Sequence, residues 1–82
     1  MIRLVNKNFL SPKENEVLLL IIAGLTNSQI AKKMCVSVST VKTYVEKIYI
    51  KLQVHNRIEL LVFAVKNNII EIEKDFPNSA II

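Results

Sequence analysis

The sequence contains a single cysteine and a single histidine among its 82 residues. Cys35 and His55 therefore cannot form a disulfide within the chain or supply the three or four ligands of a zinc site. No apolar run approaches the ~20 residues that cross a bilayer, and Asn6, Asn8 and Glu14 interrupt the stretch where a signal peptide has its apolar core. We therefore expect a cytoplasmic protein that contacts no membrane, holds no metal or cofactor and, without a second catalytic group near His55, is not an enzyme.

Strand and turn signals are also scarce. The chain has one glycine, Gly24, and it lacks Asn-Gly and Asp-Gly pairs as well as any sustained alternation of apolar and polar residues. Those are the sequence patterns of β-hairpins. Their absence predicts an all-α protein, and 51% hydrophobic residues are enough for the single small core of one domain.

Positive charge is concentrated in the middle of the chain. The formal net charge is +4, and residues 10–70 carry eight basic and four acidic side chains, whereas the tail at 71–82 is acidic. A basic domain favours a polyanionic partner such as nucleic acid, although a moderately basic surface also serves solubility. We divide the chain into an N-terminal arm (1–9), a helical domain (10–70) and an acidic tail (71–82), which is an extra helical turn or a frayed end.

Four helices are indicated by the residues that cap their starts. Ser11 and Glu14 have the spacing of a capping box, with Pro12 at the first helical position. Thr26 and Gln29 repeat this spacing before the second helix. The expected N-caps are Ser11, Thr26, Ser37 and Asn56, and the helices then cover about 12–23, 27–34, 38–52 and 57–67. The predicted fold is an all-α four-helix bundle.

The second and third predicted helices have matching apolar faces. On the third helix this face is formed by Val41, Val45, Ile48 and Leu52, and on the second by Ile30, Ala31 and Met34. The sequence CVSVS between them leaves room only for a tight turn, in which Cys35 is expected to be a small buried residue. Two short helices crossing through a tight turn form a helix-turn-helix, whose second helix can present its outer face to a major groove.

That outer face carries short polar side chains between two lysines. Ser39, Thr43, Glu46 and Ile50 lie opposite the apolar stripe, with Lys42 and Lys47 on the flanks. Lysines can pair with phosphates, Lys42 can also reach a base edge, Thr43 offers a hydroxyl or a methyl group, and Glu46 can accept from a cytosine amine. The alternative is an ordinary solvated helix face.

A family resemblance extends over about residues 10–66, which are LSPKENEVLLLIIAGLTNSQIAKKMCVSVSTVKTYVEKIYIKLQVHNRIELLVFAV. It rests on Leu-Ser-Pro-x-Glu-x-x-Val-Leu, Gly-Leu-Thr-Asn-x-x-Ile-Ala, Ser-x-x-Thr-Val-Lys-x-x-Val and Lys-Leu-x-Val-x-Asn-Arg. In these motifs the chain resembles the LuxR/NarL/GerE-type helix-turn-helix domain of bacterial transcription regulators. The resemblance implies a four-helix DNA-binding domain whose third helix enters the major groove and whose fourth helix forms the dimer contact.

The resemblance also implies roles for individual residues. Lys42, Thr43 and Glu46 match base-contacting positions. Phosphate-contacting positions are matched by Thr40, Lys47, Thr26, Asn27 and Ser28. The last three start the second helix, where exposed amides and the positive dipole end favour an anion in any case. Gln53 stands where the family commonly has glycine.

The fourth predicted helix has more apolar residues than one core face can use. By helical period, Ile58, Leu61, Val62 and Val65 are expected to pack on the bundle, and Leu60, Phe63 and Ala64 to lie on the opposite side. We predict that Leu60, Phe63 and Ala64 form the interface of a homodimer. The alternative is that terminal residues cover them, with Ile2, Leu4, Ile69, Ile70 and Ile72 as candidates.

These patterns predict a transcription regulator that binds double-stranded DNA sequence-specifically as a homodimer. The alternative is a helical interaction module that docks on RNA polymerase or on another regulator. Only nine residues precede Leu10, where regulators of this type usually carry a receiver or ligand-binding domain. The chain is therefore expected to be a stand-alone regulator or an isolated output domain, and Met1 and the absence of a tag favour the first.

Overall fold

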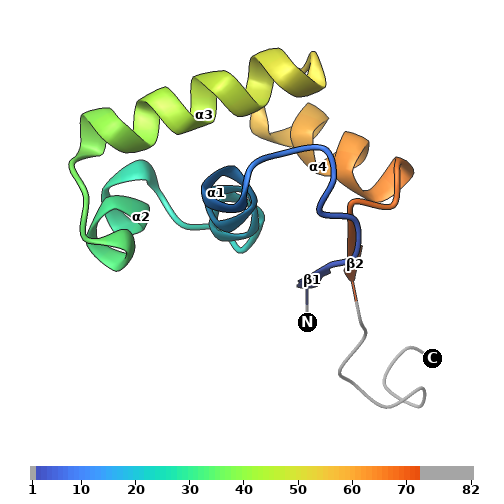
Figure 1. Ribbon diagram of the computed structural model, residues 1–82, viewed down its shortest axis with the longest axis horizontal. Helices are drawn as coiled ribbons and strands as arrows, with labels where there is room; N and C mark the ends of the chain where they lie inside the picture. Colours follow the sequence, from blue (N-terminus) through green and yellow to red (C-terminus); the bar gives the residue numbers. More distant parts are fainter. Residues whose placement is uncertain (1, 73–82) are drawn as a thin grey trace.

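The computed structural model describes residues 2–72 (Figure 1). Residues 73–82 of the predicted acidic tail lie outside this range. The elements in chain order are β1 (Ile2–Leu4), α1 (Pro12–Ile22), α2 (Asn27–Met34), α3 (Val38–Leu52), α4 (Arg57–Lys66) and β2 (Ile70–Ile72). In Figure 1, α3 runs along the top of the molecule, with α2, α1 and α4 beneath it from left to right. Because α3 contacts each of the other three helices, it is supported along its inner side and its opposite side faces outward. The mainly helical fold with four helices is confirmed.

The helix starts have the predicted caps. In α1 and α2 the capping box is complete: Ser11 and Thr26 each accept a hydrogen bond from the backbone N–H three residues later, and Glu14 and Gln29 accept from the backbone N–H of the cap. Ser37 and Asn56 cap α3 and α4 through the same hydroxyl or amide contact. Local sequence therefore determines where each helix begins.

A short antiparallel sheet joins the two ends of the described chain, and the sequence patterns did not predict it. β1 pairs with β2 in the register Ile2↔Ile72, Arg3↔Glu71 and Leu4↔Ile70, and Arg3 donates to the Glu71 carboxylate at 2.8 Å. Strands of three residues are too short to show a clear alternation, and the two strands are remote in sequence and are not joined by a tight turn. The expectation of no strand, and of an extra helical turn or a frayed end at 71–72, was wrong.

The core lies between α3 and the helices beneath it. Its fully buried side chains come from all four helices and from the segment before β2, and they include Val17, Leu18, Ile30, Val41, Ile48, Leu60 and Ile69. Among the described residues, no helix has the length and apolar character needed to cross a membrane.

The fourth helix buries the face opposite to the one predicted. Leu60 and Ala64 are fully buried, and half-buried Phe63 packs edge-to-face on Phe9 with ring centroids 6.2 Å apart. The residues expected to face the bundle are instead exposed: Ile58 by 76%, Val62 by 56%, Val65 by 45% and Leu61 by 38%. The predicted dimer surface is therefore wrong for Leu60 and Ala64, which have no accessible surface to offer.

The terminal segments explain this orientation. After α4 the chain turns back, and the Ile69 backbone N–H donates to the Ala64 carbonyl at 2.8 Å. Ile69 and Ile70 are buried in the same core as Leu60, and Ile2 and Leu4 are partly buried against it. The termini thus cover the Leu60 side of α4, which is the alternative stated above, and they leave the other apolar face exposed.

Candidate nucleic-acid interface

The connection between α2 and α3 is a tight turn built on one left-handed residue. Cys35 has φ 58° and ψ 43°, and its N–H and that of Val36 donate to carbonyls of the last turn of α2. Such a C-cap is usually glycine, because other residues carry a steric cost in this conformation. The Cys35 side chain is exposed, so the expectation of a buried cysteine was wrong.

Apolar packing then fixes which side of α3 faces outward. Ile30 and Ala31 of α2 are buried together with Val41 and Ile48 of α3. Val45 and Met34 pack at the edge of the same core. This arrangement is the predicted helix-turn-helix, and the opposite side of α3 is directed to solvent.

The three predicted base-contacting residues lie together on that exposed side. Lys42, Thr43 and Glu46 are all exposed, at the spacing that places them on one side of a helix. The Thr43 hydroxyl donates to the Ser39 carbonyl at 3.1 Å. Thr43 therefore offers a partner its methyl group and the lone pairs of its oxygen, but its only hydroxyl proton is already engaged within the helix.

Two predicted phosphate contacts line one shallow hollow beside those residues. Thr40 and Lys47 border it with Thr43 and Tyr44, and its volume is about 220 Å³. The hydroxyls of Ser37 and Thr40 are 2.9 Å apart, which holds Thr40 in place at the start of α3. The hollow thus combines an ammonium group with a fixed hydroxyl, two groups that contact phosphate oxygens in protein–DNA complexes.

The start of α2 gives the second predicted phosphate site. Thr26 and Ser28 are exposed and Asn27 is half-buried. The Thr26 hydroxyl accepts from the Gln29 N–H at 3.2 Å, so that hydroxyl mainly serves the cap. The N–H groups of Asn27 and Ser28 have no partner within the helix, because they belong to its first turn. Since Gln29 is uncharged, the cap does not repel an anion.

The charge on the outer side of α3 is mixed. Lys42 and Lys47 are exposed, and among residues 2–72 no carboxylate forms an ion pair with either of them. Both ammonium groups can therefore pair with external phosphates. Glu46 and the exposed Ile50 reduce the cationic character of the same side.

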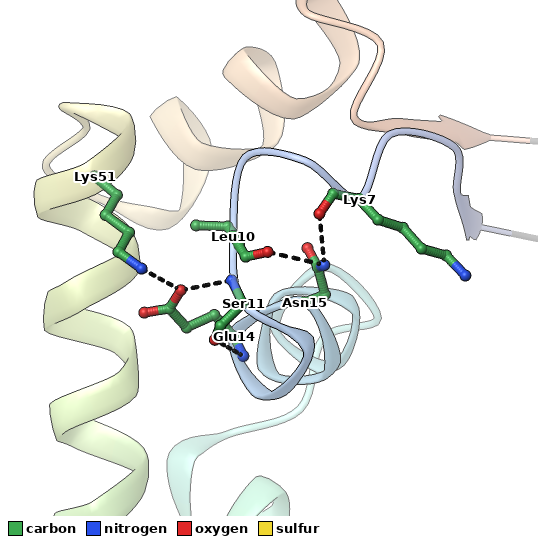
Figure 2. A network of polar contacts seen from close by, with 6 residues as sticks. All are labelled: Lys7, Leu10, Ser11, Glu14, Asn15 and Lys51. Atoms are coloured by element: carbon green, nitrogen blue, oxygen red, sulfur yellow. Dashed lines mark hydrogen bonds and ion pairs between the residues drawn. The ribbon is translucent and has the colours of Figure 1, made fainter.

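A partly buried ion pair between α1 and α3 could be predicted only in part from the sequence. Opposite charges allow Glu14 to pair with Arg57 or Lys51 across the bundle, and the sequence does not decide between them. In the structure Lys51 Nζ lies 2.6 Å from Glu14 Oε1 (Figure 2). Arg57 donates instead to the Ile21 carbonyl at 3.3 Å. Burial raises the pKa of the Glu14 carboxyl, but hydrogen bonds from Lys51 and Ser11 outweigh this effect and place the pKa below its ordinary value of 4.5. Glu14 is therefore ionised at neutral pH.

Within residues 2–72 no group of three or more histidine, cysteine, aspartate or glutamate side chains is placed to hold a metal ion. His55 interacts instead with Glu59 on the surface, at 3.2 Å between Nδ1 and Oε1. The polar groups of the outer face are hydroxyls, the ammonium groups of Lys42 and Lys47 and the carboxylate of Glu46.

Comparison with known proteins agrees with this geometry. Residues 8–64 match the family of bacterial regulatory proteins described as the luxR family. The chain is 42% identical over 60 residues to "Probable transcriptional regulator ycf29" of Cyanophora paradoxa, covering 73% of this chain and 29% of that protein. It is 39% identical over 62 residues to the response regulator protein VraR of Staphylococcus aureus, covering 76% of this chain and 30% of VraR. The chain thus spans about 30% of the length of these curated relatives.

Two solved structures share the fold. The response regulator ChrA of a heme-sensing two-component system superposes with a TM-score of 0.70 and 37% identity, over 79% of this chain and 32% of ChrA. The Vibrio cholerae protein VqmA, described as a dimer and a LuxR-type receptor, gives a TM-score of 0.70 and 30% identity, over 73% of this chain and 27% of VqmA. Because the family match includes α1, α2, α3 and most of α4, the chain belongs to the LuxR family of bacterial regulatory proteins and is a helix-turn-helix DNA-binding domain of a transcription regulator, not an enzyme.

Proposed function

We propose that this domain binds specific double-stranded DNA sequences with α3 in the major groove. The observation that carries the proposal is the outer side of α3, where Lys42, Thr43 and Glu46 are exposed together on a helix whose inner side is fully packed. A helix held in this way can enter a groove about 12 Å wide and contact base edges. A regulator of bacterial genes acts on DNA in the cytoplasm, where we expect this protein.

We assign the contacts by chemistry. Lys42 can donate to guanine or pair with a phosphate, Thr43 can contact a thymine methyl group, and Glu46 can accept from cytosine. Thr40 and Lys47 border the hollow beside them and are assigned to the phosphates of one strand. The free amides of Asn27 and Ser28 at the start of α2, next to the exposed cap residue Thr26, are assigned to a further phosphate.

We also propose that two copies join through the exposed face of α4, formed by Ile58, Leu61, Val62 and Val65, here called the α4 stripe. A contiguous apolar face on an exposed helix is unfavourable in water and indicates an interface. The related regulator VqmA is described as a dimer. A two-fold dimer would present two copies of α3 to half-sites about 34 Å apart, which would compensate for the mixed charge of each outer face.

The test is selection of bound duplexes from a random pool, followed by affinity measurements at several salt concentrations. We expect enriched sites with an inverted repeat, and a logarithmic affinity that falls linearly with the logarithm of salt because phosphate contacts release counterions. A module that docks on RNA polymerase or another regulator would enrich no DNA sequence. Its binding to its partner would not show this dependence on salt, because no phosphate counterions are released. That outcome would reject the proposed function.

A further inference from the structure

Glu14 lies at the centre of a polar network that connects α1 with α3 (Figure 2). Its side chain is 4% exposed, and Oε1 accepts from the Ser11 backbone N–H at 2.9 Å and from Lys51 Nζ at 2.6 Å. Ser11 caps the start of α1, and Lys51 lies in the last turn of α3. Among residues 2–72 the bond to Lys51 is the one side-chain hydrogen bond between these two helices.

The negative charge of Glu14 is not needed for the cap of α1. The same chain contains a second capping box, in which Gln29 Oε1 accepts from the Thr26 N–H at 2.8 Å. That geometry matches the contact between Glu14 and Ser11, at 2.9 Å, without a carboxylate. An amide therefore suffices for the cap in this protein. The charge of Glu14 is left with one further partner in the structure, the ammonium group of Lys51 on α3.

This partner is well placed to control the orientation of α3. Apart from Glu14 and Asn15, the buried residues of α1 and α3 are apolar. Apolar contacts are not directional, whereas a short charge-assisted hydrogen bond fixes a direction. Lys51 lies nine residues beyond Lys42, or about 14 Å along the helix axis. A tilt of about 5° displaces a point at that distance by about 1 Å, which exceeds the ~0.5 Å tolerance of a directed contact.

We propose that Glu14 is a positioning residue for the DNA interface: through Lys51 it fixes the orientation of α3 on α1 and thereby the ability of α3 to distinguish its site from other duplexes. The inference rests on the proposed function, because it assumes that α3 contacts bases. It assigns to Glu14 no contact with DNA. It also separates two roles of one side chain, the cap through Ser11 and the alignment through Lys51.

Glu14→Gln keeps the cap and removes the ion pair, and Glu16→Gln is its matched control. Glu16 is on the same helix, and its pair with Lys13 at 3.6 Å is exposed. Affinities for the selected site and for an unrelated duplex are measured at a temperature where circular dichroism shows every variant folded. We expect the ratio of the two affinities to fall about tenfold in Glu14→Gln, the loss of roughly one directed base contact, and to stay unchanged in Glu16→Gln.

Two further measurements keep the test decisive. If Glu14→Gln does not fold, Lys51→Met should lower the same ratio and Lys51→Arg should retain it, since arginine can still donate to the carboxylate. Residual dipolar couplings of backbone amides in α1 and α3 report their relative orientation without DNA, and they should change in Glu14→Gln but not in Glu16→Gln.

The possible outcomes separate the two proposals. A wild-type protein that does not distinguish duplexes rejects the proposed function, and this inference with it. A wild-type protein that does distinguish them, with equal ratios in Glu14→Gln and Glu16→Gln and unchanged couplings, rejects only the role of Glu14. A ratio that falls equally in Lys51→Met and Lys51→Arg also rejects it.

Discussion

The α4 stripe makes a quantitative prediction about self-association. The exposed fractions of Ile58, Leu61, Val62 and Val65 together equal about two whole side chains per protomer, or about four per dimer. Complete burial of one such side chain contributes about 1.5–3 kcal/mol, so the gross gain is roughly 6–12 kcal/mol. Association costs an estimated ~4–15 kcal/mol in lost freedom. The gain and the cost are of similar size, so association is weak in solution; a net gain of about 4 kcal/mol corresponds to a Kd of about 1 mM.

We therefore expect monomers in solution and dimers on DNA. Two half-sites on one duplex hold the protomers at an effective concentration in the millimolar range, where a weak contact becomes significant. Analytical ultracentrifugation at about ten micromolar protein, well below that Kd, should show monomers alone, one protomer on a single half-site, and two protomers bound cooperatively on an inverted repeat.

Val62→Lys tests whether the α4 stripe is the contact. Val62 is 56% exposed, so the variant should fold, and its added positive charge can only favour DNA electrostatically. Loss of cooperativity in this variant would then be due to the interface, because the contribution of Val62 in two protomers is comparable with the small net free energy of the contact. Asn67→Lys is the control, because it adds the same charge at the exposed end of α4. Cooperativity that survives in Val62→Lys would refute the reasoning, as would independent binding by the wild type.

Three other predictions concern single side chains. Lys47→Ala should weaken binding to all duplexes and reduce the salt slope by about one, whereas Thr40→Ala should weaken binding without reducing the slope. Fluorescence titrations at about four salt concentrations measure both effects. An unchanged slope in Lys47→Ala would show that Lys47 does not contact a phosphate. Thr43→Val should keep the base preference at its position, because the hydroxyl proton is already bonded to Ser39, while Thr43→Ala should lose about 1–3 kcal/mol of discrimination in competition binding. Glu14 has a lowered pKa, so its stabilising effect is present above pH 4.5 and is lost as pH falls through the folded-state pKa. Urea unfolding at several pH values should therefore show a steeper acid loss of stability in the wild type than in Glu14→Gln, and parallel curves would contradict this.

The sequence was most informative where polar and apolar residues contrast. In α3 the apolar stripe and the polar face are distinct, so the outward side of the helix and the exposure of Lys42, Thr43 and Glu46 could be predicted. Capping residues gave the helix starts for a similar reason, since each cap depends on residues only three positions apart. Gln53, which ends α3, shows the limit of this approach. It adopts the left-handed conformation, with φ 56°. A glycine at this position would have predicted that conformation, whereas a glutamine does not.

The buried face of α4 and the sheet could not be predicted because both depend on contacts between distant residues. Nearly every position of α4 from Ile58 to Val65 is apolar, so its periodicity does not distinguish an inner side from an outer side. The choice is made by Ile69 and Ile70, which follow the helix, are buried in the same core as Leu60 and are held there by the pairing of β2 with β1. The sheet therefore has a functional consequence despite its small size. By occupying the Leu60 side, the paired termini leave Ile58 and Val62 exposed, and the same pairing that completes the monomer core determines which face of α4 is available to a second copy.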